Sequence, residues 1–256
     1  MNIHFKSKRI QQIQEYVFQN KTASLDELVE KFQVSKNIIR RDIQWLVERG
    51  EFKKVYGGVA ANEGTTLVPF TDRQTRNQKE KVLIAQLAAN FVEEGDIIFL
   101  DSGTTTCEMF EFLKNRELTI ITNNLTFIIN SLPYDNLHII SIGGTLERKT
   151  NSFTSLKKTD FFEAYNINKT FMASTGVSTT YGVTNASPVE SELKKMAMAK
   201  GPTVFLLIDH EKFDKQSLMT YCKLSEIDYL VTNKTPEEKY REYAKNIIFR
   251  LCHPDR

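Results

Sequence analysis

The sequence predicts an α/β protein of two domains: a small helical domain with a hairpin at residues 1–59, and a larger domain with a mainly parallel sheet at 77–256. Three observations predict this division. Apolar residues recur at helical spacing before residue 50, a stretch without periodicity follows, and beyond it short apolar runs alternate with helix-like segments. A length of 256 residues suits one large domain or two modest ones.

Composition excludes several classes of protein. A hydrophobic content of 41% and a charged content of 26% are typical of a globular chain rather than a fibrous or disordered one. No apolar run approaches the roughly 20 residues that cross a bilayer, and Met1–Arg9 lacks the apolar core of a signal peptide, so we expect a cytoplasmic protein. The three cysteines and four histidines lack metal-ligand spacing, so we expect reduced thiols, no metal and no cofactor.

Charge is distributed unevenly along the chain. The whole sequence carries a net charge of +2, whereas residues 1–60 contain 11 basic and 7 acidic side chains. A basic head on a nearly neutral body is typical of a protein that meets a polyanion. An ordinary solvated surface would show the same charge balance. The pattern of residues must therefore decide between a polyanion-binding domain and a solvated surface.

The first fifty residues predict three helices, each with apolar side chains on one face. Ser24 and Glu27 form a capping box at the start of the second helix. Ser35 can cap the third helix and Gly50 ends it. The second and third helices, joined by a tight turn, make a helix-turn-helix. The apolar faces comprise Ile10, Ile13 and Val17; Leu25, Leu28, Val29 and Phe32; and Ile39, Ile43, Leu46 and Val47.

The outward face of the third helix carries side chains that can read DNA. Arginine bonds guanine, and asparagine or glutamine bonds adenine, from the early turns of the second motif helix. A short basic hairpin over residues 51–58 predicts a wing against phosphate. We therefore predict a winged helix-turn-helix that binds double-stranded DNA; an ordinary charged helical bundle is the alternative. The predicted DNA-binding residues are Ser35, Lys36, Asn37, Arg40, Arg41, Gln44, Lys53, Lys54 and Tyr56.

Residues 60–76 lack apolar periodicity and contain turn formers, which predicts a linker between the domains. A helix with an apolar face between Val82 and Phe91 follows. Five apolar runs of strand length then end in small or polar residues, which predicts a sheet covered on both faces. The carboxyl ends of such strands form the ligand crevice. The runs are Ile97–Leu100, Leu118–Ile121, Leu137–Ile142, Thr170–Ala173 and Val204–Ile208.

The loop Asp101–Thr106, after the first of these runs, is the most informative. A glycine and several hydroxyls between a buried strand and a helix can present amides and hydroxyls to an anion, and phosphate is the simplest candidate. The alternative is a strand–helix turn capped by its own threonines. The loop is not a P-loop, because no Gly-Lys-Ser/Thr follows at the needed spacing.

Residues 34–43 read V-S-K-N-I-I-R-R-D-I and are followed by Tyr56-Gly57-Gly58. This motif resembles the signature of the DeoR family of bacterial transcription regulators, which runs V-S-x-x-T-[IV]-R-R-D-L and ends in H-G-G. Two positions depart from it, since Ile38 replaces the threonine and Tyr56 replaces the histidine.

The second domain resembles the effector domain of the same family, which is similar to the sugar-phosphate isomerase and CoA-transferase-like fold. The shared motifs are D-x-G-T-T, T-N, G-G, G-[IV] and D-x-x-K-F after successive strands. Glu192–Lys195 resembles the family's E-V-K-R, which makes Lys194 a candidate cation for a phosphate, with a solvated helix lysine as the alternative. Ser155 replaces the glycine of the family's S-F-x-G.

The resemblance implies that this domain binds a phosphorylated sugar and changes the DNA affinity of the head. The candidate effector-binding residues are Asp101, Ser102, Gly103, Thr104, Thr105, Thr106, Asn123, Asn124, Gly143, Gly144, Gly176, Lys194, Asp209 and Lys212, with Thr122 and Phe213 in the same motifs.

We therefore predict a transcriptional repressor of a sugar-uptake or catabolic operon, controlled by a phosphorylated sugar and acting as a homo-oligomer, dimer or tetramer. One alternative is a sugar-phosphate isomerase with an appended regulatory domain, for which carboxylates are available. A second is a DNA-binding scaffold whose larger domain only oligomerises. We expect no catalysis, because no nucleophile–base pair has a recognisable spacing and a DNA-reading head would serve an enzyme poorly. The available carboxylates are Asp101, Glu190, Glu192 and Asp209.

Overall fold

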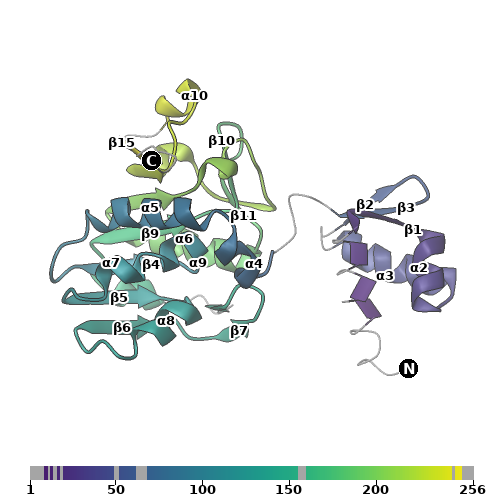
Figure 1. Cartoon of the computed structure of the whole chain (residues 1–256), viewed down its shortest axis with the longest axis horizontal. Helices are drawn as coiled ribbons and strands as arrows, with labels where there is room; N and C mark the ends of the chain where they lie inside the picture. Colours follow the sequence, from purple (N-terminus) through teal and green to yellow (C-terminus); the bar gives the residue numbers. More distant parts are fainter. Residues whose placement is uncertain are drawn as a thin grey trace. The chain divides into compact units, whose positions relative to one another are not determined.

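The chain divides into two compact units, Met1–Thr66 and Leu67–Arg256 (Figure 1). Gly50 and Ser155, which the sequence singles out, lie outside the described residues. The computed structural model describes residues 9–10, 12–13, 16–17, 20–48, 52–61, 68–154, 160–243 and 246–249.

The N-terminal unit is a winged helix-turn-helix, as predicted. Its described residues between 9 and 20 are helical. The antiparallel sheet has the order β1-β3-β2, and β1 was not predicted. The apolar faces meet in one core that includes Ile13, Leu28, Ile39 and Leu46, all fully buried. The other elements are β1 (Thr22–Ser24), α2 (Leu25–Phe32), α3 (Lys36–Glu48), β2 (Phe52–Val55) and β3 (Gly58–Ala61).

The predicted capping box at the start of α2 is confirmed. The Glu27 amide donates to Ser24 Oγ at 3.1 Å, and the Ser24 amide donates to Glu27 Oε2 at 3.2 Å. The helix ends at Gln33, whose φ of +50° is left-handed and turns the chain toward α3. The carbonyl of Ser35 then accepts from the amides of Ile38 and Ile39 at 2.9 and 3.1 Å.

The wing is a hairpin whose two glycines have different roles. Val55 pairs with Gly58, so Tyr56 and Gly57 form the turn, and Gly57 has a left-handed φ of +75°. A Cβ on Gly58 would lie 2.2 Å from the carbonyl oxygen of Ala23 in β1. Only glycine at position 58 therefore lets β3 pair with β1 on its other side.

The structure corrects the linker predicted at residues 60–76. Ala60 and Ala61 belong to β3, and α4 (Phe70–Thr75) lies within the predicted linker. Phe70 is 3% exposed and packs in the core of the second unit. A short helix with a single buried apolar residue gives no periodic pattern, so α4 was not predicted from the sequence.

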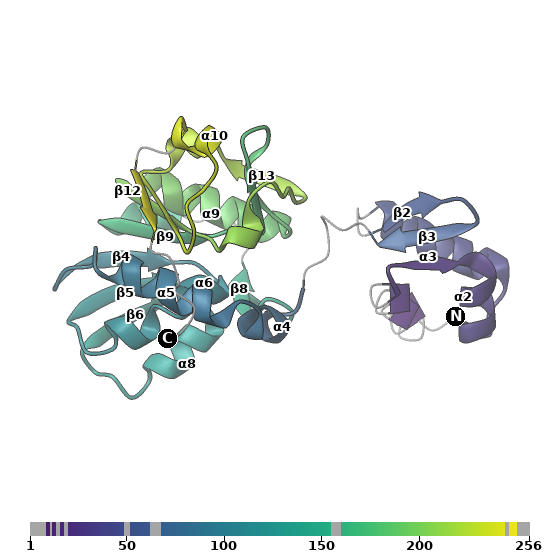
Figure 2. The same cartoon turned by 45° about the horizontal axis from the view of Figure 1, so that its top comes forward.

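The second unit is built on a seven-stranded sheet in which every pairing is parallel, with the order β15-β14-β12-β9-β4-β5-β6 (Figure 2). The five predicted runs are β12, β9, β4, β5 and β6, which are neighbours in the sheet with β6 at one edge, while β14 and β15 were not predicted. The strands are β4 (Ile97–Leu100), β5 (Leu118–Thr122), β6 (Leu137–Ser141), β9 (Lys169–Ala173), β12 (Thr203–Leu207), β14 (Tyr229–Thr232) and β15 (Asn246–Phe249).

Helices cover both faces of this sheet, as continuous apolar strands require. Residues of α5, α7 and α8 pack with Ile98 and Leu100 on one face, and residues of α9 pack with Phe99 on the other. In the part of the chain that the structure describes, no helix has the length and apolar character needed to span a bilayer. The helices are α5 (Gln78–Ala89), α6 (Thr104–Cys107), α7 (Phe110–Leu113), α8 (Leu125–Ser131), α9 (Pro188–Lys200) and α10 (Glu238–Arg241), with single turns η1 (Asp160–Ala164), η2 (His210–Lys212) and η3 (Leu224–Glu226).

The strand order reverses between β4 and β9. From β4 the chain moves outward to β5 and β6, and from β9 it moves the other way to β12, β14 and β15. Loops that follow β4 and β9 therefore diverge and leave a place where polar side chains can gather at the carboxyl edge. Two small antiparallel sheets complete the unit: β7 (Thr145–Glu147) with β8 (Ser152–Thr154), and β11 (Gly182–Asn185) between β10 (Gly176–Ser178) and β13 (Met219–Cys222).

Candidate functional site

The outward face of α3 carries most of the predicted DNA-binding residues. Arg40 and Arg41 are exposed, and neither forms an ion pair within the described residues. Lys36 is also exposed, and its Nζ lies 2.5 Å from Asp26 Oδ1 at the surface. Gln44 is half-buried. The exposed members of the predicted set are Ser35 just before α3, Lys36, Asn37, Arg40 and Arg41 on α3, and Lys53, Lys54 and Tyr56 on the wing.

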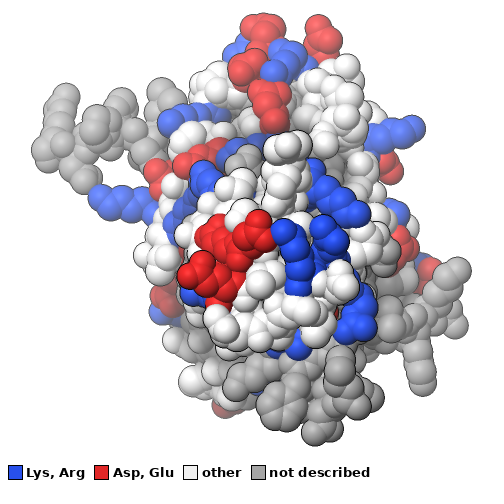
Figure 3. Space-filling model, turned by 90° about the vertical axis from the view of Figure 1, so that its right-hand side faces the viewer, with Lys and Arg blue, Asp and Glu red and all other residues white. Residues whose placement is uncertain are grey.

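On the face shown in Figure 3, several basic side chains lie beside a group of acidic side chains. Tyr56, at the tip of the wing, is fully exposed. The residues that the sequence selected thus lie on the two elements that a winged helix-turn-helix presents to DNA.

Asp42 follows the two exposed arginines but points inward. Its side chain is 0% exposed, and Oδ2 accepts from Arg9 Nε at 2.7 Å. Its other oxygen, Oδ1, has no partner within the described residues. In the Arg-Arg-Asp run, Arg40 and Arg41 are therefore exposed on the outward face of α3. Asp42 instead connects α3 to the first helix through its ion pair with Arg9. The sequence assigned no role to this pair, because Arg9 and Asp42 are 33 positions apart.

In the second unit, Asp101 joins the two strands at the reversal point. Its Oδ1 accepts from the Gly103 amide at 2.8 Å and from Thr106 Oγ1 at 2.7 Å. Its Oδ2 accepts from the Ala173 amide at 2.7 Å and forms an ion pair with Lys194 Nζ. All four donors are protein groups, and Asp101 is 2% exposed. Asp101 therefore ties the end of β4 to the end of β9 and to α9.

Lys194 is buried, so the alternative of a solvated helix lysine is wrong. Besides the pair with Asp101, its Nζ donates to the carbonyl of Ala173 at 2.9 Å. Tyr221 donates to the same carbonyl at 3.0 Å, and Lys194 Nζ lies 5.4 Å from its ring centroid. The charge of Lys194 is thus already matched by a carboxylate within the protein.

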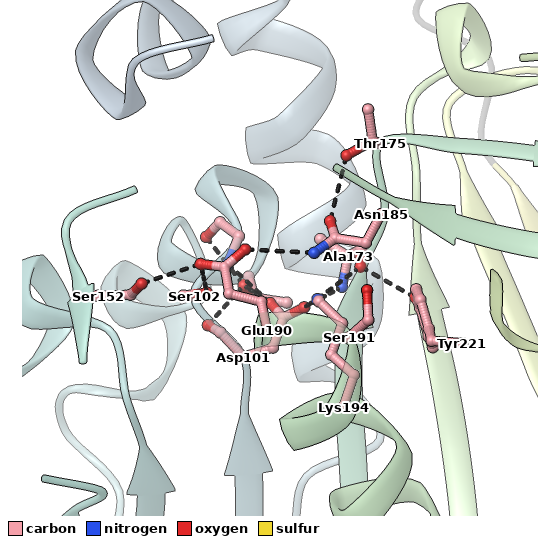
Figure 4. A network of polar contacts seen from close by, with 12 residues as sticks. Asp101, Ser102, Ser152, Ala173, Thr175, Asn185, Glu190, Ser191, Lys194 and Tyr221 are labelled. Carbon is pink, nitrogen blue, oxygen red and sulfur yellow. Dashed lines mark hydrogen bonds and ion pairs between the residues drawn. The ribbon is translucent and has the colours of Figure 1, made fainter. Parts of the chain in front are cut away.

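Glu190, also from α9, is the centre of a second group of polar contacts (Figure 4). Its Oε1 accepts from Ser102 Oγ at 3.1 Å and from Ser152 Oγ at 2.9 Å. Its Oε2 accepts from Asn185 Nδ2 at 3.2 Å, and Asn185 is oriented by Thr175. Three segments that are far apart in the sequence therefore meet at one buried carboxylate. From the sequence, Glu190 was interpreted only as a carboxylate available to an isomerase.

Two cations that the sequence did not select lie near these carboxylates. Arg73 from α4 interacts electrostatically with Glu190 and Asp101, which partly offset the lowering of its pKa by burial. Lys81 from α5 is 4% exposed, and burial lowers its pKa to about 8 although Asp209 opposes the shift. The Lys81 ammonium donates to the carbonyl of Arg73.

Lys212 and Asp209 were both selected from the sequence and lie beside these cations. Burial lowers the pKa of Lys212, again against the attraction of Asp209. Asp209 Oδ1 accepts from the Glu211 amide at 2.9 Å and from Asn77 Nδ2 at 3.4 Å. Burial is thus the main cause of the lowered pKa of both Lys81 and Lys212, and Asp209 opposes it in each case.

Most of the remaining predicted residues form hydrogen bonds within the protein or are buried. Thr106 donates within its own loop, as the alternative of a self-capped turn expects, and Thr104 and Thr105 are buried beside it. Asn124 caps α8 through the amide of Phe127 at 3.1 Å. Asn123 donates to a carbonyl of β8 at 3.0 Å, and its Oδ1 is buried without a partner among the described residues.

The predicted glycines serve the backbone. A Cβ on Gly103 would lie 2.4 Å from Ala173 Cβ, and one on Gly176 would lie 2.5 Å from the carbonyl oxygen of Lys215. Gly143 and Gly144 are exposed, with open space around a Cβ at Gly143. Their position between β6 and β7 therefore fits a turn.

Comparison with known proteins connects both units to one family. The DeoR-like helix-turn-helix domain matches residues 9–65, and the DeoR C terminal sensor domain matches residues 76–234. The HTH-type transcriptional regulator IolR of Bacillus subtilis (strain 168) is 43% identical over 240 residues, which cover 93% of this chain and 96% of that protein. The lactose phosphotransferase system repressor of Staphylococcus aureus (strain NCTC 8325 / PS 47) is 30% identical, covering 91% of this chain and 94% of its own.

Among solved structures, ribose 5-phosphate isomerase A from Methanocaldococcus jannaschii is similar over 54% of this chain and 55% of its own, with 15% identity and a TM-score of 0.40. The sensor-domain match alone covers more than half of the chain, and the relatives match nearly all of it. The arrangement of a winged helix-turn-helix before an α/β sensor unit is the one that both domain matches describe. The chain therefore belongs to the DeoR family of transcriptional regulators.

Proposed function

We propose that this protein is a cytoplasmic repressor of a sugar-uptake or catabolic operon, and that a phosphorylated sugar controls its affinity for operator DNA. The observation that carries the DNA-binding half is that Arg40 and Arg41 on α3 are exposed and form no ion pair within the described residues, while the wing carries the exposed Lys53 and Lys54. A relative with 30% identity is named a repressor of a lactose phosphotransferase system, which supports regulation of sugar uptake. We further propose a dimer or tetramer that reads repeated half-sites.

Arg40, Arg41 and Asn37 are proposed to reach base edges from the first turns of α3. Lys53 and Lys54 on β2 are proposed to contact phosphate, because their side chains are exposed on the wing. Base contacts would set the preferred operator sequence, and phosphate contacts would set the salt dependence.

The carboxyl edge of the large sheet is the proposed effector site. Its support is the gathering of Asp101, Glu190 and Arg73 at the strand-order reversal, where α/β sheets bind ligands. Two buried side-chain atoms there, Asn123 Oδ1 and Ser174 Oγ, lack partners among the described residues. Because unsatisfied buried groups are costly, hydroxyls of a sugar or ordered waters are expected to complete them.

The contacts of Asp101 argue against a role for this carboxylate as a general base. Asp101 already accepts from Gly103, Thr106, Ala173 and Lys194, so a proton could reach it only if one of these contacts broke. A general base needs an oxygen within reach of the substrate proton, which this arrangement does not offer at Asp101. The same contacts suit a rigid wall for a bound metabolite.

The test is operator binding by the full chain. A preferred duplex is first selected from a random pool, and its dissociation constant is then measured across salt concentrations, with and without each member of a panel of sugar phosphates. At least one member should change operator affinity by roughly 5–150-fold, while its unphosphorylated parent sugar should not. Operator affinity that is indifferent to every phosphorylated sugar would contradict the sensing half. Turnover of a sugar phosphate would instead favour an enzyme.

A further inference from the structure

One edge of the large sheet is open to a further strand. β6 lies at this edge beside α8 (Figure 1), and within the described residues it pairs with β5 alone. Its register with β5 runs without a break from Leu137 to Ser141. Edge strands are normally protected by a lysine, a proline or a bulge, because their unpaired backbone groups invite another strand. The sequence of β6, L-H-I-I-S, contains neither residue, and its register has no bulge.

The backbone groups that face this open edge follow from the pairing on the other side of β6. The amide of Ile142 donates to the carbonyl of Thr122 at 2.9 Å, so the backbone of Ile142 faces β5. Along a parallel strand, successive residues direct their backbone groups to opposite sides. The amides and carbonyls of Ile139 and Ser141 therefore point away from β5. The carbonyl of Leu137 points the same way, while its amide already donates within the chain.

These outward groups match a second copy of the same strand. In an antiparallel pair, residues that directly oppose each other exchange two backbone hydrogen bonds at every second position. When Ile139 opposes its own counterpart across a two-fold axis, it can make both of these bonds. Ser141 of one copy then opposes Leu137 of the other, so its amide meets an outward carbonyl. Each chain thereby contributes two donors and two acceptors to the pairing.

The sequence around β6 is nearly without charge. Residues 118–146 contain one charged side chain, Asp135, although 26% of the whole chain is charged. Two copies can therefore meet at this edge with little like-charge repulsion. Depletion of charged residues is a feature of the buried core of protein interfaces rather than of surfaces that stay in solvent.

α8 packs against β6 and presents apolar side chains outward. Phe127 and Ser131 are its buried residues, whereas Ile129 is 54% exposed and Leu132, at its end, is 75% exposed. These two are three positions apart and share one face of the helix. A two-fold axis that makes two β6 strands antiparallel is perpendicular to the sheet. It therefore places α8 of both copies on the same face of the joined sheet, where their exposed apolar side chains can pack together.

We propose that β6 pairs with β6 of a second copy of this chain, and that the two copies of α8 cover the junction. The inference rests on the oligomer in the proposed function and assigns the surface that forms it. A contact of this kind closes with two subunits, because the same surface serves both. It also joins two DNA-binding units in one assembly, as the reading of repeated half-sites requires.

The first experiment measures the association of the full chain by sedimentation velocity over a range of concentrations. Ser141→Pro removes an outward amide and places a ring where the second strand would lie, whereas proline is tolerated at a strand edge whose amide faces solvent. It should weaken association by about tenfold or more, the effect of losing about 1.4 kcal/mol of binding free energy. Ser141→Ala is the matched control, because it keeps the amide and should associate as wild type does.

A second pair of variants tests the apolar face of α8. Leu132→Glu brings like charges together at the junction and should also weaken association by about tenfold or more. Tyr181→Glu adds the same charge at another exposed side chain of this unit, which is 52% exposed, and should leave association unchanged. Far-ultraviolet circular dichroism checks that each variant is folded.

Disulfide cross-linking tests the register without disturbing the edge. Opposed residues of a hydrogen-bonded pair have Cα atoms about 5.5 Å apart, within the ~4.4–6.8 Å of a disulfide, so Ile139→Cys should give a covalent dimer on mild oxidation. His138 opposes Ile140 in this register and lies about 7–8 Å from its own counterpart, which is too far. His138→Cys should therefore cross-link much less, although position 138 is the more exposed. The unsubstituted chain, with its three cysteines, sets the background.

The β6 junction is overturned if the wild-type chain is monomeric at micromolar concentration. It is also overturned if Ser141→Pro and Leu132→Glu associate as wild type does and Ile139→Cys cross-links no better than His138→Cys. The proposed function fails separately. If the chain assembles through another surface and a sugar phosphate still changes operator affinity, only the junction is wrong. If β6 joins two copies but no sugar phosphate affects operator binding, the junction stands and the sensing function is wrong.

Discussion

The ion pair between Arg9 and Asp42 joins the first helix to α3, and its two ends are buried unequally. The side chain of Arg9 is 17% exposed, whereas that of Asp42 is 0% exposed. Arg9→Met leaves the Asp42 carboxylate buried without its counter-ion and without contact to solvent. Asp42→Asn leaves an arginine that can turn its guanidinium toward solvent. Arg9→Met should therefore destabilise the N-terminal unit more than Asp42→Asn does.

The expected magnitude is large for a unit of this size. Removing one partner of a buried ion pair destabilises a protein by about 3–5 kcal/mol. The unit Met1–Thr66 would have a total stability of only about 3–10 kcal/mol at the usual ~0.05–0.15 kcal/mol per residue. We expect Arg9→Met to lower its free energy of unfolding by about 3 kcal/mol or more, and Asp42→Asn by about 1–2 kcal/mol.

Trp45 makes this measurable in the intact chain. It is the single tryptophan of the sequence and lies on α3, so its fluorescence reports on the N-terminal unit alone. With a urea dependence of about 1 kcal/mol/M, the midpoint for Arg9→Met should fall by about 3 M or the unit should be unfolded without urea. Lys36→Met breaks only the exposed pair with Asp26 and should change stability by less than about 0.5 kcal/mol. Two small and equal effects, or a larger effect of Asp42→Asn, would refute the reasoning.

Three further predictions concern the exposed face of α3 with the wing, and the second unit. Arg40→Ala should weaken preference for one base pair by about 1–3 kcal/mol, while Lys53→Ala should weaken binding to all sequences and reduce the salt slope of operator affinity. Gly103→Ala should destabilise the second unit by about 1–3 kcal/mol in thermal unfolding, because the added Cβ would lie 2.4 Å from Ala173 Cβ. The pKa of Lys81 is lowered from 10.5 to about 8 on folding, so the unfolded chain binds more protons between these values. Unfolding free energy should therefore rise with pH across that window, and the rise should be smaller in Lys81→Met.

The sequence predicted the elements whose signals are local. The capping box of Ser24 and Glu27 is contained within four residues, and each central strand is a short apolar run bounded by small or polar residues. By contrast, β15 (Asn246–Phe249) is only partly buried at one edge of the sheet and gives a weak pattern. Local signals therefore predicted five neighbouring strands, including the edge strand β6, and failed for β14 and β15 at the other edge.

The candidate site was predicted less completely, because tertiary packing brings its charges together. Arg73 fell within a stretch interpreted as linker, since α4 has six residues and buries chiefly Phe70. Lys81 lies one residue before the apolar stripe of α5, where a lysine is normally solvated. Only the packing of α4 and α5 against α6 brings both residues to the end of the first strand loop. A buried lysine has no signature of its own in a single sequence.

Asp101 is one of the carboxylates that the sequence offered for the alternative of an isomerase, and in the structure its contacts join three elements. Its carboxylate is surrounded by donors from its own loop, from β9 and from α9, so displacing any one of them would leave a buried group unsatisfied. That arrangement makes the reversal point between β4 and β9 stiff and specific in shape. Proton transfer requires a carboxylate oxygen within reach of the substrate, and both oxygens of Asp101 already accept from protein donors.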